Sequence, residues 1–196
     1  MMRTAAIERK TKETDIRLTL CIDGTGQTEL ATGVGFFDHM LDALCRFAQF
    51  DLTLDCAGDL QVDAHHTVED AGICLGKAIR EALGDRVGIR RVGSAFMPMD
   101  EALAFAAIDV SGRPYLAWEA DFTAPLCGAM NTQLAEEFFR AVTVNAGLTV
   151  HMSLLAGRND HHRMEALFKA FGLALRDAVR LDANIQGVLS TKGTLD

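Results

Sequence analysis

Hydrophobic and polar residues alternate along several stretches of the chain, which predicts strands with one buried face. The clearest stretch is 15–23, where Ile16, Leu18 and Leu20 alternate with residues such as Arg17 and Thr19. The same reasoning predicts strands at 5–11, 51–56, 102–109, 115–120 and 148–154. Ser111–Pro114 is a favourable turn sequence, so the third and fourth of these are expected to be joined as a hairpin.

Apolar residues at helical spacing predict helices between these strands. The first has Asp38 near its start and ends beyond Phe47. The second follows residue 64 and stops at Gly84. The third is expected to be capped by Asn131 and to end near Gly147, and the fourth is expected to run to about Leu181. The apolar positions of the first three helices include Met40, Leu41, Leu44, Ile73, Ile79, Leu134, Phe138 and Val142.

The chain repeats itself. One constant offset places His65 on His161, Glu69 on Glu165 and Gly76 on Gly172, and the agreement extends into the preceding strand. Each half therefore reads β-β-α-β-α, with pseudo-repeats at about 1–94 and 95–196 in one domain that covers 1–196. Strands that precede helices and are joined by hairpins favour an α+β layered fold over a doubly wound parallel sheet.

The repeat is centred on a pair of histidines followed by a glutamate, HHxxE, at His65–Glu69 and His161–Glu165. On a helix, the first histidine and the glutamate share a face, whereas the two histidines point roughly 100° apart. Imidazole and carboxylate together suit Mn, Fe, Zn or Co better than Ca or Mg. Each motif is therefore predicted to serve two ions, or one ion and a neighbour; the alternative is two helix starts with merely solvated histidines.

The remaining histidines bear on the number of ligands. Two ions with about six ligands each need more than four imidazoles and two carboxylates, so His39 and His151 are candidates to join the motifs. Open positions would then remain for substrate or water. Asp70 falls on Ala166 in the repeat, so it is expected to support the site or the helix start rather than bind an ion.

Composition limits the function classes. The 196 residues are 49% hydrophobic with a net charge of −8, which argues against nucleic-acid binding but not against a phosphorylated small molecule. The sequence has neither a long apolar run nor a secretion leader. Its five scattered cysteines, without a CxxC, are typical of reduced thiols, so a cytoplasmic protein is expected. Charge and hydropathy together predict that it binds neither nucleic acid nor membrane.

Several motifs resemble those of the imidazoleglycerol-phosphate dehydratase family over nearly the whole chain. They are Gly33–Asp42, Asp63–Asp70, Pro98–Ala104, Asn159–His162, Glu165–Phe171 and Ser190–Gly193. The resemblance implies helices packed between β-sheets, as in ribosomal protein S5 domain 2-like folds. It also implies a lyase of histidine biosynthesis that dehydrates D-erythro-imidazoleglycerol phosphate to imidazoleacetol phosphate through a dimetal-bound imidazolate, with two Mn²⁺ per active site, in a homo-oligomer of 24 subunits.

The resemblance also assigns residues. It implies as metal ligands His39, His65, His66, Glu69, His151, His161, His162 and Glu165. Glu8 matches a glutamate near the substrate and is the candidate for proton transfer or for positioning a metal-bound water. Substrate binding, including the phosphate, is implied for Glu8, His39, Arg91, Arg113, Lys169, Ser190, Thr191 and Lys192.

One departure and two alternatives stay open. Ala43 stands where the family usually has a glutamine that helps hold the phosphate end, and Arg46 or Gln49 could replace it. A different dinuclear enzyme, such as a metallohydrolase, would also use these ligands, as would a metal-stapled structural shell without activity.

Overall fold

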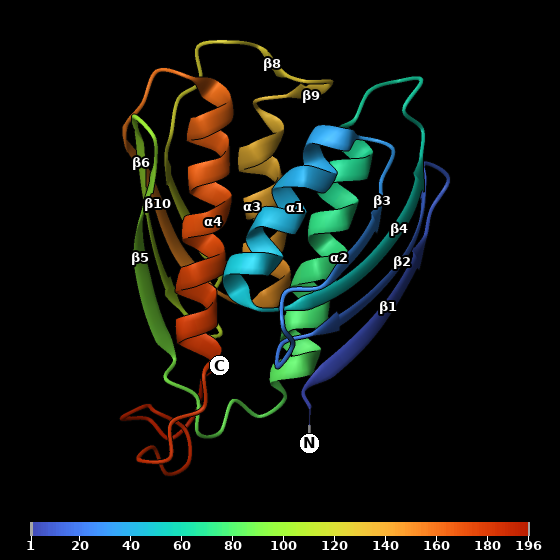
Figure 1. Cartoon of the computed structure of the whole chain (residues 1–196). Helices are drawn as coiled ribbons and strands as arrows, with labels where there is room; N and C mark the ends of the chain where they lie inside the picture. Colours follow the sequence, from blue (N-terminus) through green and yellow to red (C-terminus); the bar gives the residue numbers. More distant parts are fainter. Residues whose placement is uncertain (1, 196) are drawn as a thin grey trace.

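The computed structural model describes residues 2–195, which form two four-stranded sheets with four helices between them (Figure 1). The first sheet has the strand order β1-β2-β4-β3. Its strands are β1 (Thr4–Lys10), β2 (Thr14–Cys21), β3 (Thr28–Ala31) and β4 (Asp51–Gly58). β1, β2 and β4 pair antiparallel, whereas β3 runs parallel to β4.

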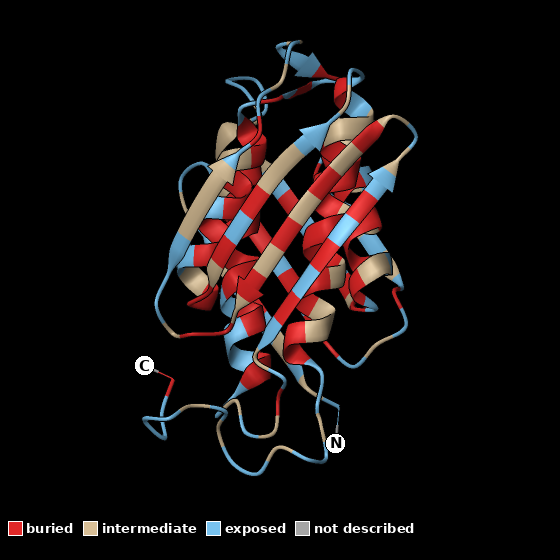
Figure 2. Cartoon of the chain, turned by 90° about the vertical axis from the view of Figure 1, so that its left-hand side faces the viewer, coloured by how far each residue is buried: buried red, intermediate tan, exposed pale blue. Residues whose placement is uncertain are grey.

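The second sheet has the equivalent order, β5-β6-β10-β7, and again only its last pair is parallel. Its strands are β5 (Val92–Met99), β6 (Ala102–Asp109), β7 (Tyr115–Glu119) and β10 (Thr149–Ala156). Figure 2 looks onto the outer face of this sheet, where buried residues alternate with more exposed ones along β5 and β6. This alternation places one row of each strand against the helices.

The helices fill the space between the sheets. They are α1 (Gly35–Ala48), α2 (His65–Leu83), α3 (Leu134–Ala146) and α4 (Asp160–Val179). α2 covers the first sheet and α4 covers the second, while α1 packs on α4 and α3 packs on α2. The core between them includes a cluster of phenylalanines from three helices: Phe37, Phe138, Phe139, Phe168 and Phe171. Within residues 2–195, no helix is both long and apolar enough to cross a membrane.

The strand pairing extends the internal repeat to the hairpins. Thr4 pairs with Cys21 and Val92 with Asp109, so the two hairpins are related by an offset of 88 residues. The HHxxE motifs are related by 96, from His65 to His161. The second half therefore has extra residues between the hairpin and the motif, and they fall between β7 and α3, where the short strands β8 (Leu126–Cys127) and β9 (Met130–Asn131) form a hairpin.

The duplicated helices cross at duplicated glycines. A Cβ atom on Gly76 of α2 would lie 2.7 Å from the carbonyl oxygen of Val142 on α3. A Cβ atom on Gly172 of α4 would lie 2.4 Å from the carbonyl oxygen of Leu44 on α1. Each glycine therefore lets two helix backbones approach closely, and at the second crossing this sets how near α1 comes to α4.

The predicted α+β class, with duplicated halves and helices between sheets, is confirmed, but several local predictions are wrong. The first half contains one strand more than expected, β3, and the second contains three more, β5 and the short strands β8 and β9. The strands β6 and β7 do not form the expected hairpin, because β10 lies between them and pairs with both. Asn131 does not cap α3, which begins three residues later, at Leu134.

Candidate metal centre

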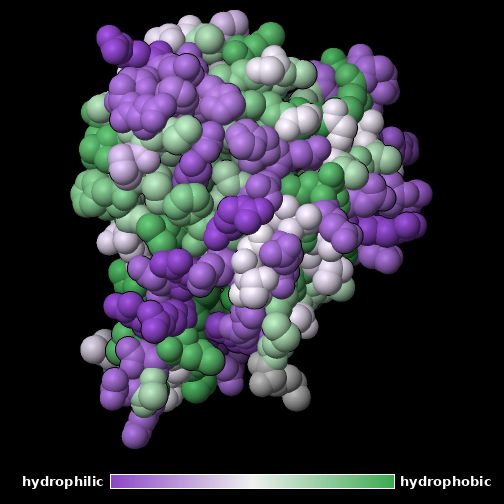
Figure 3. All heavy atoms as spheres, in the orientation of Figure 1, coloured by the Kyte–Doolittle hydropathy of each residue, from purple (hydrophilic) through white to green (hydrophobic). Residues whose placement is uncertain are grey.

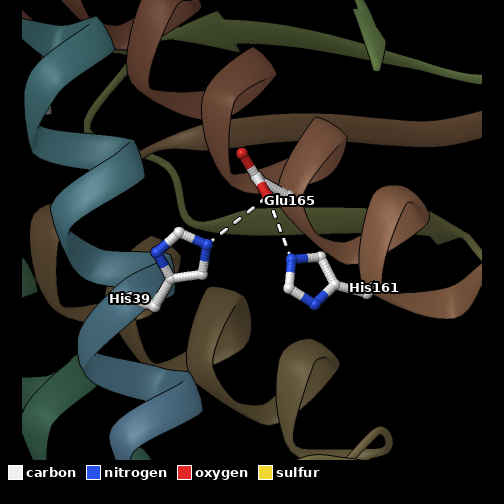
Figure 4. A group of neighbouring side chains, drawn as sticks. All are labelled: His39, His161 and Glu165. Carbon is white, nitrogen blue, oxygen red and sulfur yellow. Dashed lines mark hydrogen bonds and ion pairs between the residues drawn. The ribbon is translucent and has the colours of Figure 1, made fainter. Parts of the chain in front are cut away.

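Three predicted ligands meet where α1 and α4 face each other (Figure 4). The Glu165 Oε2 atom lies 3.2 Å from His161 Nε2 and 3.5 Å from His39 Nε2. Both imidazoles are exposed, whereas Glu165 is buried. Across residues 2–195, this is the one group of three histidine, cysteine or acidic side chains whose donor atoms all lie within 4.8 Å of one another.

The spacing of these donor atoms fits a divalent cation. Metal–ligand bonds of about 2.0–2.2 Å place neighbouring donors of one ion roughly 3 Å apart and opposite donors roughly 4.3 Å apart. The two distances to Glu165 therefore match neighbouring ligands of a single ion. Two imidazoles and one carboxylate also form the mixed donor set that Mn, Fe, Zn and Co accept.

Lys169 holds the other oxygen of the same carboxylate. Its Nζ lies 2.5 Å from Glu165 Oε1, one helical turn further along α4, and 5.3 Å from the centre of the Phe47 ring. Burial alone would raise the pKa of Glu165, but the Lys169 ammonium and the neighbouring His39 hold this pKa below its ordinary value. Glu165 is therefore an anion at neutral pH, ready to bind a cation.

The first HHxxE motif lies at the start of α2. The His65 Nε2 and Glu69 Oε2 atoms are 3.9 Å apart, and both side chains are close to half exposed. In both motifs the two histidine rings stand nearly perpendicular, at 85° and 86°, so they face different directions as the helical spacing requires. The backbone N–H groups of His65 and His161 donate to Asp63 and Asn159, which occupy equivalent positions in the repeat.

The second histidine of each motif is held by a carboxylate. The Nδ1 atom of His66 lies 3.0 Å from Asp59 Oδ2, and that of His162 lies 2.8 Å from Glu101 Oε2. These hydrogen bonds raise the pKa of both imidazoles. The sequence predicts no role for either carboxylate, although Glu101 lies inside the Pro98–Ala104 motif.

His151 and Glu8 lie elsewhere in the chain. His151 is exposed on the outer face of the second sheet, with its ring 6.1 Å from that of Tyr115. Glu8 is exposed on the outer face of the first sheet, across from Arg17 in the strand register. A single chain therefore does not bring either residue to the group around Glu165.

The predicted phosphate ligands, Lys169 excepted, gather at the far end of α4. The backbone N–H of Arg91 donates to the carbonyl oxygen of Ala178, and its guanidinium binds Asp109 and the carbonyl oxygen of Leu189. The neighbouring tail carries Ser190, Thr191 and Lys192, and exposed Arg113 follows β6 at the same end of the sheet. Figure 3 shows hydrophilic side chains interspersed with hydrophobic ones over the lower part of the molecule.

Contacts also describe two further positions, Asp70 and Ala43. The Asp70 carboxylate does not support a histidine but accepts hydrogen bonds from Arg9 and Thr14, which ties the β1–β2 hairpin to α2. Ala43 is buried in the core. Of its proposed substitutes, Arg46 lies loosely beside Asp42 at 3.7 Å, and Gln49 forms the left-handed end of α1.

Comparison with known proteins agrees with this geometry. The family model described as imidazoleglycerol-phosphate dehydratase matches residues 32–175. The chain belongs to the imidazoleglycerol-phosphate dehydratase family. It is 56% identical to the family's protein from Acetivibrio thermocellus, with all of both chains covered, and 58% identical to that from Symbiobacterium thermophilum, with 98% and 93% covered.

Solved structures of imidazoleglycerol-phosphate dehydratases share the fold. The Staphylococcus aureus structure superposes with a TM-score of 0.83 at 37% identity, covering 91% of this chain and 99% of that one. The Pyrococcus furiosus structure, in complex with (S)-C348, gives 0.82 at 35% identity, covering 96% and 100%. Family membership makes the chain an enzyme, a dehydratase of histidine biosynthesis, and implies that it depends on metal.

Proposed function

We propose that the chain is a lyase that dehydrates D-erythro-imidazoleglycerol phosphate to imidazoleacetol phosphate, at a site that binds two Mn²⁺ ions. The observation that carries the proposal is the meeting of His39, His161 and Glu165 in a chain of this family, with a second HHxxE motif in the equivalent place of the other half. When bound, the two ions would supply Lewis acidity that stabilises negative charge on the substrate's imidazole ring.

The chain's own residues would hold the ions and orient the substrate. His39, His161 and Glu165 form one set of ligands, and His65, His66 and Glu69 form the core of a second, with His162 and His151 completing them. Glu8 is our candidate for moving the proton next to the ring, because a carboxylate on an exposed strand face can reach a bound substrate without desolvation.

The separation of these residues supports a homo-oligomer. From His161 to Ala178, beside which Arg91 lies, α4 rises by roughly 25 Å, at about 1.5 Å per residue. A small substrate cannot bridge that distance, so in our proposal the phosphate-binding cations other than Lys169 come from another copy of the chain. We propose 24 subunits, the number that the family resemblance implies.

The outer face of the second sheet supports the same assembly. Phe96, Tyr115 and Leu155 are all more than half exposed there, beside His151. Large exposed apolar side chains on one face are typical of an interaction surface. We therefore place His151 at a contact between copies, where it can join the ligands of a neighbouring chain.

The phosphate site of the proposal consists of Arg91, Arg113, Lys169, Ser190, Thr191 and Lys192. Lys169 is the member that stands beside the metal ligands, and its contact with Glu165 places one cation near the proposed ions. Guanidinium groups suit bidentate contact with phosphate oxygens, and ammonium groups add point charge. For location we propose the cytoplasm, because five free cysteines, four of them buried, fit a reducing compartment.

Metal content and turnover of His161→Ala test this proposal. Wild-type protein supplied with Mn²⁺ should hold two ions per chain and eliminate water from imidazoleglycerol phosphate. The variant should lose at least about 100-fold in kcat/KM, because it loses a ligand of an ion that stabilises the transition state by several kcal/mol. Glu81→Gln, an exposed position on α2, is the matched control that should keep full activity.

The same experiment separates the alternatives. A metallohydrolase would release inorganic phosphate from the substrate instead of eliminating water. A metal-stapled shell would show neither reaction, and removal of its ions would dissolve the assembly. Near-normal dehydration by a folded His161→Ala protein would refute the proposed ligand set.

A further inference from the structure

The two halves hold the second histidine of their motifs in the same way with residues from different places. His66 is held by Asp59, which follows β4, and His162 by Glu101, which lies in the turn between β5 and β6. Under the offset of 96 that relates the motifs, the position equivalent to Asp59 is Leu155, so the repeat did not simply copy this carboxylate. Two unrelated positions therefore supply the same contact to equivalent imidazoles.

The chemistry of the contact fixes the proton. An ionised carboxylate can only accept a hydrogen bond, so the Nδ1 atom of each imidazole must carry the hydrogen. A neutral imidazole then has its free lone pair on Nε2, the atom that can bind a cation. In both halves a second carboxylate lies near Nε2 but beyond hydrogen-bond distance, at 3.8 Å: Glu13 in the case of His66 and Asp100 in the case of His162.

Glu101 is itself held firmly. Its Oε1 atom accepts the backbone N–H groups of Arg158 and Asn159, at 3.0 and 2.8 Å, just before α4 begins. Its Oε2 atom is thereby directed at His162 Nδ1. For Asp59 the geometry is looser, because both of its oxygens lie at nearly equal distances, 3.1 and 3.0 Å, from His66 Nδ1.

We propose that Glu101 and Asp59 are positioning residues that fix His162 and His66 in the tautomer whose Nε2 binds metal, with Glu101 the stricter of the two. The inference rests on the proposed function, since it assigns a task to residues behind the proposed ligands. Such partners behind a metal-binding histidine typically change metal affinity by about 10–100-fold.

Glu101→Gln gives a sharp test because the hydrogen bonds constrain the new amide. Its carbonyl oxygen is needed by the N–H groups of Arg158 and Asn159, so its NH₂ group must face His162 Nδ1. An NH₂ group can only donate, and His162 is then forced to carry its hydrogen on Nε2. The fold keeps its contacts while the metal-binding lone pair is removed.

Two measurements test the proposal: the tautomer of His162 in metal-free protein and the affinity of the protein for Mn²⁺. Nitrogen-15 NMR of labelled histidine in metal-free protein at about pH 9, where imidazoles are neutral, should show the Nδ1–H tautomer at His162 in wild type and the Nε2–H tautomer in Glu101→Gln. Titration with Mn²⁺ should show affinity lower by about 10–100-fold in that variant.

Asp59→Asn is the internal comparison. Its amide can rotate to present oxygen to His66 Nδ1, because no backbone donor fixes its orientation among the described contacts. It should therefore keep the Nδ1–H tautomer and lose less than about tenfold in affinity for Mn²⁺. Glu81→Gln should match wild type in both measurements.

The outcomes separate this inference from the proposed function. If wild-type protein binds no Mn²⁺ and eliminates no water, the proposed function fails. If wild type does both but Glu101→Gln retains the Nδ1–H tautomer, or binds Mn²⁺ within twofold of wild type, the positioning role is refuted. Glu101→Asp, which shortens the side chain but keeps the carboxylate, should preserve the tautomer, and a reversed tautomer there would also overturn the inference.

Discussion

The crossing of α1 and α4 at Gly172 offers the most direct test of how the fold builds the site. Alanine at this position would place its Cβ 2.4 Å from the carbonyl oxygen of Leu44. The helices must then separate by 0.6 Å (3.0 − 2.4) to reach the shortest separation that real side chains show, and by 1.0 Å (3.4 − 2.4) for ordinary contact. His39 lies on α1 and Glu165 on α4, so these proposed metal ligands would move apart with the helices.

The magnitude follows from two opposing effects. Alanine favours a helix interior over glycine by about 1 kcal/mol, whereas overpacking costs about 1–3 kcal/mol. We expect a net loss of about 1–2 kcal/mol for Gly172→Ala, which is a few degrees in Tm for a chain of this length. Donor atoms at a metal site tolerate errors of only about 0.2 Å, so Mn²⁺ affinity should fall by at least about tenfold.

Two matched variants isolate the effect on the site. Gly76→Ala overpacks the equivalent crossing of α2 and α3, so it should lose similar stability but leave the spacing of His39 and Glu165 intact. Gly35→Ala, at an exposed start of α1 with open space around its Cβ, should lose neither. Thermal unfolding and Mn²⁺ titration at one fixed protein concentration measure both quantities. Unchanged Mn²⁺ affinity in a destabilised Gly172→Ala protein would refute the reasoning.

Three further predictions concern charge. Lys169→Met should raise the pKa of Glu165, because the effect of burial is no longer offset by an ammonium at 2.5 Å. Carbon-13 NMR of labelled glutamate in metal-free protein measures this pKa, and an unchanged pKa would contradict the ion pair between Lys169 and Glu165. Asp70→Asn should lower the free energy of unfolding by about 2 kcal/mol, because the buried side chain loses its charge beside the partly exposed Arg9, but it should leave the metal content at the wild-type level. Denaturant unfolding and metal analysis measure the two quantities, and loss of an ion would show that Asp70 supports the metal site. Burial opposes the ionised form of Asp160, but hydrogen bonds from Ala124, Thr123 and Arg163 lower its pKa, so its contribution to stability is complete above the unfolded pKa of about 3.9 and is lost as pH falls through the lower folded pKa. In metal-free protein, Asp160→Asn should therefore reduce the fall in unfolding free energy at acid pH, and an unchanged fall would exclude this role.

Local patterns predicted the elements whose periodicity is strong. The β2 strand and all four helices appear where alternation or helical spacing placed them, and Gly84 ends α2 as expected. The β3 strand was missed because four residues, Thr28–Ala31, are too few to display a period. The β5 strand contains Gly93 and Pro98, which weaken any strand pattern.

Long-range pairing lay beyond the sequence. Nothing local in the turn at Ser111–Pro114 reveals that β10, more than 30 residues later, will lie between β6 and β7. For the site, the repeat predicted which side chains bind metal, and the structure brings three of the predicted ligands together in one chain. The sequence predicted no role for Asp59 or Glu101, because their role depends on tertiary proximity to an imidazole nitrogen and not on spacing.

Lys169 breaks the equivalence of the two halves. Its counterpart in the first repeat is Ile73, so the glutamate of the second motif shares its charge with an ammonium, whereas Glu69 has only His65 within ion-pair distance among the described residues. A carboxylate already partly neutralised attracts a cation less strongly. As Mn²⁺ is added, the proposed site at Glu69 should therefore fill before the one at Glu165. We expect two steps in the binding isotherm of the wild type, and these should merge into one in Lys169→Met.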